Sequence, residues 1–326
     1  MKSQQDKNLQ ASWEQGSGPE HAPERVRRLQ EDQEAFLQAL AEKSDGGALR
    51  GDYSRADAQY IVAQQWDDYT PQQHALWRRL YARQAALLPG RACQEFIDNL
   101  ARMRAADGIP DFAKASQALL QATGWTLVAV PGLVPDRTFF EHLAARRFPV
   151  TVWLREPAEF DYIVEPDVFH DFFGHVPLLF DPVFAGHLQE YGKGGLKAMT
   201  LDGLPFLARL YWYTIEFGLV RTPAGLRAYG AGLLSSGGEI AHCLTSPDSR
   251  RIGFDVERVM RTLYKIDSYQ ETYFVIDSFA ELFDKTKPDF APIYARLQNL
   301  PPLPADALLP GEHDIALDRH CAVGTP

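Results

Sequence analysis

The sequence is poor in cysteine, in long apolar runs and in basic residues. Its three cysteines, Cys93, Cys243 and Cys321, are widely spaced, so they predict no disulfide framework and favour a reducing compartment. No apolar run approaches the ~20 residues of a membrane span, and the polar N-terminus is unlike a signal peptide. Since 33 Lys and Arg stand against 43 Asp and Glu, the formal charge is −10, which argues against a nucleic-acid-binding surface. We therefore expect a cytoplasmic protein with no membrane or nucleic-acid partner.

What is present is the composition of a globular protein. The 326 residues are 45% hydrophobic and 23% charged, and a chain of this length can bury a core without disulfides. Residues 1–50 are polar and predict a tail that is partly helical or disordered, and residues 291–326 predict a Pro-rich C-terminal tail. Between them, residues 51–290 contain no repeat and no linker, so we expect a single domain there.

Periodicity and helix-breaking residues predict a mainly α fold with minor β structure. Thr70 and Pro71 are typical of an N-cap and a first helical position, and Gly124 is expected to close a short helix over 116–123. Apolar, β-branched runs predict strands over 125–130, 150–154 and 272–276. Further helices are expected over 139–147, 184–189, 205–219, 225–234 and 255–264.

Two histidines, His170 and His175, lie among phenylalanines in the segment EPDVFHDFFGHVP. The zinc-protease motif HExxH separates its histidines by four residues, about 40° on a helix, whereas five residues amount to roughly 140°. Both side chains can reach one ion only if the helix begins near His170 or is bent at Gly174. A pair of core histidines bonded to the backbone is an equally compatible interpretation.

Glu216 is the one charged residue in segment 210–220, LYWYTIEFGLV. A buried carboxylate without a partner costs several kcal/mol, so we expect either a metal ion or a lone arginine beside it. Two histidines and one carboxylate are the facial triad that holds non-haem Fe(II) and leaves positions open. Zinc bound by the same three side chains is the chemical rival.

The segment YGAGLLSSGGE, residues 229–239, places two hydroxyls, Ser235 and Ser236, before a carboxylate, Glu239. Its glycines allow a close backbone approach, but no GK[ST] follows, so a phosphate loop is disfavoured. A helix end capped by serines is one interpretation. The other interpretation is that a side chain of this segment hydrogen-bonds to a metal-binding histidine and so orients its ring.

Together these three segments resemble the pterin-dependent aromatic amino acid hydroxylases, over about residues 52–278, and most closely the bacterial members that act on phenylalanine. The resemblance implies a single basket-like, mostly helical catalytic domain. It also implies a monooxygenase that converts L-phenylalanine to L-tyrosine with O2, Fe(II), and tetrahydrobiopterin or a related tetrahydropterin. The regulatory domain and the C-terminal coiled-coil helix of the animal enzymes have no counterpart here, so we expect a monomer.

The resemblance also assigns roles to single residues. It implies that His170, His175 and Glu216 hold the iron, that Arg155 clamps the substrate carboxylate, and that Asp167 steadies Arg155. The other residues that match the substrate site are Trp212, Phe217, Gly232, Ser235 and Val275. Ser235 further matches the hydroxyl that orients the first iron histidine, with Glu239 as additional support.

The pterin-binding residues implied by the resemblance are Gly132, Val134, Asp136, Phe139 and Glu165. Phe139 is expected to stack on the flat pterin ring. The segment departs from the animal enzymes at two places. Pro135 and Asp136 replace a serine pair, and Pro149 replaces a histidine that approaches the pterin.

Three alternatives remain open from the sequence. The substrate could be tryptophan or tyrosine, although the apolar Val275 stands where the tyrosine enzymes of the family carry Asp. From other classes, the chain could be a zinc hydrolase with a His2Glu site, or a binding protein with structural histidines. Metal analysis separates the classes, because they predict iron, zinc and no metal respectively.

Overall fold

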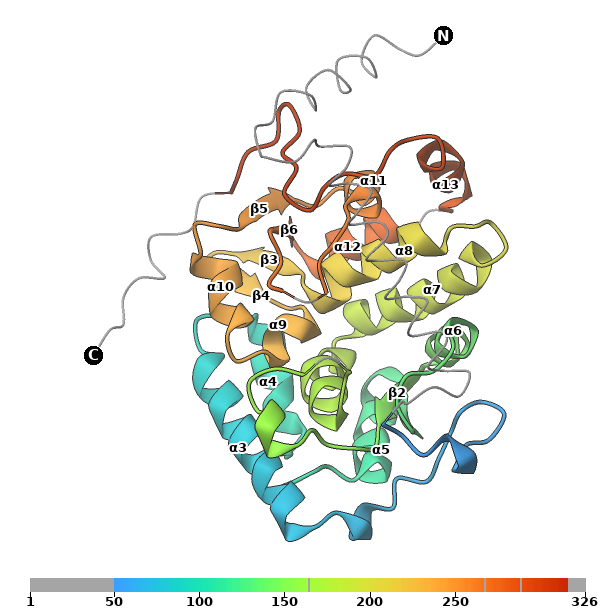
Figure 1. Cartoon of the computed structure of the whole chain (residues 1–326), viewed down its shortest axis with the longest axis vertical. Helices are drawn as coiled ribbons and strands as arrows, with labels where there is room; N and C mark the ends of the chain where they lie inside the picture. The colour runs from blue at the N-terminus through green and yellow to red at the C-terminus, as the bar shows by residue number, and fades with distance from the viewer. Residues whose placement is uncertain (1–49, 164, 267, 288, 316–326) are drawn as a thin grey trace, which may run out of the picture.

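The computed structural model describes residues 50–163, 165–266, 268–287 and 289–315 (Figure 1). Nearly all of the predicted N-terminal tail, residues 1–49, and the last part of the predicted C-terminal tail, residues 316–326, lie outside these ranges. Among the described helices, none combines the length and the apolar character that crossing a membrane requires.

Helices are the predominant regular structure of the described chain and the strands are few and short, which confirms the prediction of a mainly α fold with minor β structure. The α-helices are α3 (Pro71–Leu87), α4 (Gln94–Arg102), α5 (Phe112–Thr123), α6 (Asp136–Ala144), α7 (Pro182–Ala198), α8 (Leu204–Tyr211), α9 (Ala231–Ser235), α10 (Glu239–Thr245), α11 (Val256–Arg261), α12 (Phe279–Thr286) and α13 (Ala291–Leu297). Short 3₁₀ turns are η1 (Tyr53–Arg55), η2 (Trp66–Asp68), η3 (Pro157–Glu159) and η5 (Val176–Phe180). Two turns are π-helical, namely η4 (Phe169–His175) and η6 (Trp212–Glu216).

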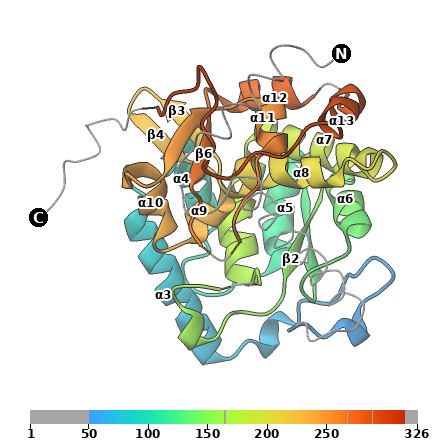
Figure 2. The ribbon, with the colours of Figure 1, turned by 45° about the horizontal axis from the view of Figure 1, so that its top comes forward.

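The strands form two small sheets. β1 (Thr126–Val130) and β2 (Arg147–Thr151) pair in parallel and are connected through α6. The second sheet has the order β4-β3-β6-β5, formed by β3 (Leu219–Thr222), β4 (Gly225–Ala228), β5 (Arg250–Gly253) and β6 (Thr272–Ile276). Figures 1 and 2 place this sheet in one half of the molecule with α10, α11 and α12, and β2 in the other half near α5 and α6.

The predicted helix signals act as expected. The Thr70 side chain accepts the amide of Gln73 while the Gln73 side chain accepts the amide of Thr70, so α3 starts in a capping box behind Pro71. Gly124 ends α5 in the left-handed region, at φ 77°. The three strand predictions correspond to β1, β2 and β6. Strand β2 occupies 147–151 instead of the predicted 150–154, because the chain turns at Arg146, where φ is 57°, and pairs with β1 from Arg147 onward.

Two helix predictions were wrong in part. Residues 225–228 of the predicted helix over 225–234 form strand β4, because they pair with β3 in antiparallel register and because the backbone of Ala228 bonds to the α3–α4 loop: its amide donates to Arg91 O and its carbonyl accepts from Cys93 N. Only Ala231–Ser235 is helical, as α9. The predicted helix over 205–219 stops being α-helical at Tyr211 and continues as the π turn η6.

Residues 291–315 pack against the body. Helix α13 buries Tyr294 and Leu297, and Tyr294 stacks on Phe206 of the segment that contains α8. Farther along, Glu312 pairs with the guanidinium of Arg258 on α11, with Nε and Oε1 2.7 Å apart. This Pro-rich stretch therefore contributes buried side chains to the same folded unit.

Candidate metal centre

The two histidines five residues apart meet because the segment that holds them is π-helical. A π-helix bonds residue i to residue i+5, so it brings the fifth residue back over the first, and such turns are frequent at functional sites. The helix η4 begins at Phe169, next to His170, which agrees with one of the two geometries that the spacing suggested, although its π-helical form was not predicted. Gly174 instead lets α9 approach: a Cβ there would lie 2.9 Å from the carbonyl oxygen of Ala231.

The opposite side of η4 is a cluster of aromatic rings that fixes this turn in the core. Phe169 and Phe173 stack with their centroids 4.8 Å apart, Trp77 of α3 meets the edge of Phe169, and Phe112 of α5 stacks on Phe172. All five rings are at most 4% exposed. The cost of a π turn is thus offset by burial of large apolar side chains on its far side.

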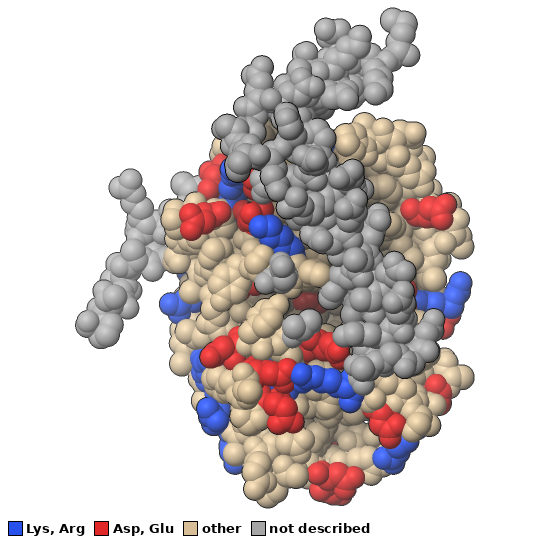
Figure 3. Space-filling model, in the orientation of Figure 1, with Lys and Arg blue, Asp and Glu red and all other residues tan. Residues whose placement is uncertain are grey.

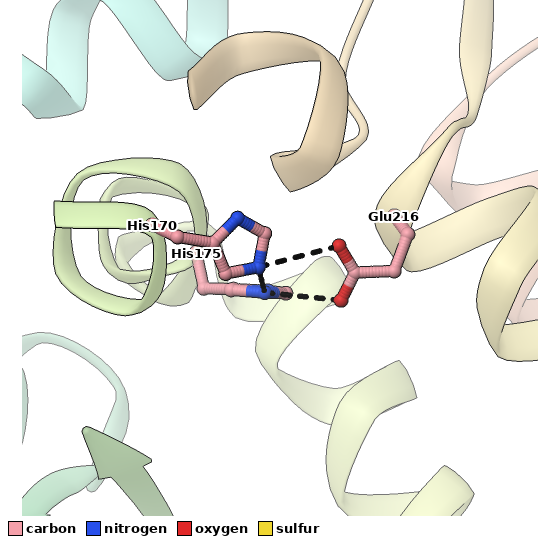
Figure 4. A group of neighbouring side chains, drawn as sticks. All are labelled: His170, His175 and Glu216. Carbon is pink, nitrogen blue, oxygen red and sulfur yellow. Dashed lines mark hydrogen bonds and ion pairs between the residues drawn. The ribbon is translucent and has the colours of Figure 1, made fainter. Parts of the chain in front are cut away.

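Glu216 reaches the two imidazoles from a second π turn, η6, where the amide of Phe217 donates to Trp212 O. The Glu216 oxygens lie 3.2 Å from His175 Nε2 and 3.5 Å from His170 Nε2, and the two Nε2 atoms are 3.3 Å apart. Figure 4 shows the two histidines projecting from one helical turn towards Glu216, which comes from a separate segment. Metal–ligand bonds are ~2.0–2.2 Å, so one ion placed among these atoms can reach all three.

The electrostatics favour the ligand form of these groups. Burial lowers the pKa of His170, which keeps the imidazole neutral with a lone pair to donate. Burial alone would raise the pKa of Glu216, but the neighbouring His175 and His170 outweigh it and hold the pKa of that carboxyl below its ordinary value. Neutral imidazoles and an ionised carboxylate are the states that bind a metal ion.

Ser235, the last residue of α9, fixes the orientation of His170. Its Oγ donates to Ala231 O at 2.8 Å and lies 3.0 Å from His170 Nδ1. Since the hydroxyl proton is committed to Ala231, the network assigns the ring proton to Nδ1, which donates to Ser235. The lone pair of His170 is then on Nε2, the atom that faces Glu216.

Arg155 and Asp167 form a buried ion pair beside the metal ligands, with side chains 3% and 0% exposed. The guanidinium donates from Nε to Oδ2 at 2.8 Å and from Nη2 to Oδ1 at 2.9 Å, a bidentate arrangement, and the Arg155 amide also donates to Oδ2. Asp167 Oδ1 accepts the amide of His170 at 3.0 Å. The carboxylate thus connects the arginine to the metal-binding turn, and leaves the Nη1 end of the guanidinium for another anion.

A wall of aromatic rings flanks Glu216, with Trp212 before it and Phe217 after it in sequence. Trp212 and Phe217 lie 4.8 Å apart, and Tyr264 stacks on Trp212 at 4.3 Å. The indole N–H of Trp212 donates to Gln270 Oε1 at 3.0 Å. Gly232 brings α9 close to this wall, because a Cβ there would lie 2.9 Å from the Phe217 ring. Neither Tyr264 nor Gln270 was singled out from the sequence, because the polar stretch around Gln270 gives no sign of burial.

Glu239 supports this wall and not His170. Its Oε1 accepts the Gln270 amide at 3.0 Å and the Tyr273 hydroxyl at 2.9 Å. The side chain is buried, and burial raises its pKa to about 7. Val275 is 3% exposed in β6, where it is in register with Leu219, three residues after Glu216.

The residues matched to a pterin site surround the turn between β1 and α6. Gly132 is packed so closely that a Cβ would lie 2.8 Å from the Tyr53 hydroxyl, which donates to Leu133 O at 2.9 Å. Burial and then the charge of Glu165 raise the pKa of Tyr53, which places Glu165 near this turn. The remaining three residues lie in or just before α6, and are Val134, Asp136 and Phe139.

Phe139 extends the pterin turn towards the metal ligands. Its ring meets the edge of Tyr211 at 5.8 Å, and Tyr211 in turn stacks on His175 at 6.4 Å. Tyr53 and Tyr211 were not singled out from the sequence. Pro149 lies in β2 in register with Val128, so it is a strand residue of the small sheet.

Comparison with known proteins agrees with this site. Residues 51–298 match a family described as biopterin-dependent aromatic amino acid hydroxylase. The chain is 59% identical over 254 residues to the phenylalanine-4-hydroxylase of Chromobacterium violaceum, which covers 78% of this chain and 86% of that protein. It is 56% identical over 274 residues to the enzyme of that name from Ralstonia nicotianae, with 84% and 85% covered. A crystal structure of the Chromobacterium violaceum enzyme with iron and phenylalanine bound matches with a TM-score of 0.76 at 55% identity, over 84% of this chain and 98% of that one.

Proposed function

The chain belongs to the biopterin-dependent aromatic amino acid hydroxylase family, and on that premise we propose that it hydroxylates L-phenylalanine to L-tyrosine. The observation that carries the proposal is the convergence of His170, His175 and Glu216 on one point, since two imidazoles and a carboxylate are a facial triad. When bound, Fe(II) and the tetrahydropterin supply O2 activation and two electrons, so that one oxygen atom enters the substrate ring and the other leaves with the pterin. The 55% identical structure with iron and phenylalanine bound supports this metal and this substrate.

The zinc hydrolase alternative loses its general base. Asp171 stands where a zinc protease carries its catalytic Glu, but Asp171 Oδ2 accepts the amide of Thr151 in β2 at 2.8 Å. The side chain therefore connects η4 to the small sheet.

For the substrate, one group of residues binds the amino acid carboxylate and another packs against its ring. The Nη1 end of Arg155 binds the amino acid carboxylate while Asp167 holds the other edge of the guanidinium. Trp212 and Phe217 orient the apolar ring beside the ligands, Gly232 leaves room for the amino acid backbone, and Val275 makes the wall apolar. An apolar wall gives no acceptor to a substrate hydroxyl, which favours phenylalanine over tyrosine by about 1–3 kcal/mol.

For the pterin, the turn at 132–136 and helix α6 form one side of the binding site. Phe139 stacks on the bicyclic ring, and Glu165 accepts hydrogen bonds from its N–H groups. Gly132 and Val134 shape the turn, and Asp136 borders it at the start of α6.

In this proposal the catalytic domain spans residues 51–290, with the 291–315 stretch packed on it. We take the protein to act as a cytoplasmic monomer without nucleic-acid or membrane partners. On the face drawn in Figure 3, Asp and Glu side chains are interspersed with Lys and Arg, and the visible part of that face carries no extended basic patch.

The direct test is aerobic turnover of phenylalanine by the Fe(II)-loaded protein with a tetrahydropterin, followed by chromatography for tyrosine. Tyrosine formation that depends on both iron and pterin is expected. Arg155→Lys keeps the charge but loses the planar fork, so the KM for phenylalanine should rise at least tenfold while the KM for the pterin changes little. Preferred hydroxylation of tryptophan or tyrosine would contradict the proposed substrate.

A further inference from the structure

Gln84 on α3 is fully buried, and its side-chain amide spans the end of α9. Nε2 donates to Leu234 O at 2.7 Å and to Ser236 O at 3.1 Å, while Oε1 accepts Nε of Arg83 at 3.0 Å. A primary amide carries two N–H donors, so both are used on the carbonyls immediately before and after Ser235. Figures 1 and 2 both show α3 passing close to α9 and α10.

The two bonds matter because, within its own helix, the Ser235 side chain is held by a single bond, to Ala231 O, at the end of a short segment. Helix α9 has five residues and ends at Ser235, and Ser236 is already extended, at φ −87° and ψ 131°. The next two residues are glycines, which restrain the backbone least. At this helix end, the direction of the Ser235 side chain depends on what holds the flanking peptide groups.

Arg83, next to Gln84, contacts a different segment of the candidate site, at Phe160 and Asp161. Its Nη1 donates to Phe160 O at 2.9 Å and contacts Asp161 Oδ1 at 3.1 Å, and its guanidinium lies 4.5 Å from the Phe160 ring centroid. Residues 160 and 161 belong to the segment that connects Arg155 with Asp167. One turn of α3 therefore contacts both the segment of the arginine clamp and the turn behind His170.

We propose that Gln84 is a positioning residue of the metal centre, which acts on His170 through Ser235. By fixing the peptide groups on both sides of Ser235, Gln84 holds Oγ at the 3.0 Å distance from His170 Nδ1 and so keeps the lone pair of Nε2 aimed at the metal position. This inference rests on the metal centre of the proposed function, and is independent of which amino acid or pterin binds there.

The test compares Gln84→Met with a matched control, Gln64→Met. The Gln64 side chain also bonds to two backbone groups of a distant segment, at the start of α5. Its Nε2 donates to Pro110 O at 2.7 Å, and its Oε1 accepts Phe112 N at 2.8 Å. The affinity of the metal-free full chain for Co(II) is measured by titration of the visible absorption, with no substrate or pterin present. We expect Gln84→Met to weaken the affinity about tenfold and to alter the spectrum, and Gln64→Met to stay within twofold. Equal effects in the two variants, or unchanged affinity in Gln84→Met, would overturn the proposal.

A double-mutant cycle with Ser235→Ala tests the route of the effect. If Gln84 acts through the Ser235 hydroxyl, adding Gln84→Met to Ser235→Ala should cost less than twofold in metal affinity. Additive losses would show that Gln84 acts by another path and refute the proposal. Gln84→Leu, which is also apolar and has no donors, serves if the Met variant folds poorly, and the same loss of affinity is expected. Because metal affinity is read without turnover, a chain that binds metal in this pattern but makes no tyrosine would contradict the proposed function alone.

Discussion

Replacing Asp167 by Asn tests how the arginine clamp and the metal turn depend on one buried carboxylate. The substitution keeps the size of the side chain and removes its charge. Each carboxylate oxygen now accepts two hydrogen bonds: Oδ2 from the amide and Nε of Arg155, and Oδ1 from Nη2 of Arg155 and the amide of His170. An Asn side chain has one oxygen, so its NH2 group takes the place of the other oxygen and faces the two donors that this oxygen accepted.

The expected loss of stability follows from burial. The Arg155 and Asp167 side chains are 3% and 0% exposed, and breaking such a pair leaves an uncompensated guanidinium in the core, which costs about 3–5 kcal/mol. Asn still accepts from some donors, so we expect the lower end, about 3 kcal/mol. For a folded body of this size, about 2–4 °C in Tm accompanies each kcal/mol, and Asp167→Asn should lower Tm by roughly 6–12 °C.

Function should fall as well, because the guanidinium loses the partner that orients it. We expect the KM for phenylalanine to rise about tenfold or more, and metal affinity to fall less, since Asp167 touches His170 only through its backbone amide. Tm is measured by calorimetry and KM by tyrosine formation.

The control is Asp277→Asn. Asp277 also pairs with an arginine, Arg221, at 3.0 Å, but the side chains are 70% and 50% exposed, so the loss should stay below about 1 kcal/mol. If Asp167→Asn lowers Tm no more than this control and leaves KM unchanged, the reasoning about the buried pair is wrong.

Three further predictions concern other parts of the site. His175→Ala removes one of three ligands and should abolish metal binding and tyrosine formation with an unchanged circular dichroism spectrum; full metal occupancy would contradict the ligand assignment. Glu239→Gln should flatten the pH dependence of stability. Burial raises the pKa of Glu239 from 4.5 to about 7, so the folded state keeps a proton that the unfolded chain releases, and stability is lost as pH rises from about 4.5 through 7, by up to about 3 kcal/mol. Urea unfolding at pH 5 and pH 8 measures this, and an equal loss in parent and variant would refute it. Val275→Asp should shift kcat/KM from phenylalanine towards tyrosine by about tenfold to a hundredfold, and a parent that prefers tyrosine would contradict the assigned role.

The sequence by itself determined the fold class and the set of candidate ligands. The helix start at Thr70 and Pro71 and the end of α5 at Gly124 are local effects, because capping and left-handed glycine depend on a few adjacent residues. The isolated charge of Glu216 in an apolar segment was visible for the same reason: burial of a lone carboxylate demands a partner wherever the segment folds. The matching residues of the site, from Arg155 to Ser235, came from long shared motifs, whose roles remain predictions.

Only the tertiary structure decided how the ligands meet. A spacing of five residues fits no regular α-helix, and η4 becomes π-helical because packed aromatic rings from α3, α5 and η4 itself stabilise its far side. The strand at 225–228 likewise depends on β3 and on the loop after α3, and so on contacts between segments far apart in the chain. Gln84 lies 150 residues from Leu234, whose carbonyl it binds. Long-range hydrogen bonds and packing of this kind have no local signature, since they arise between residues that only the folded chain brings together.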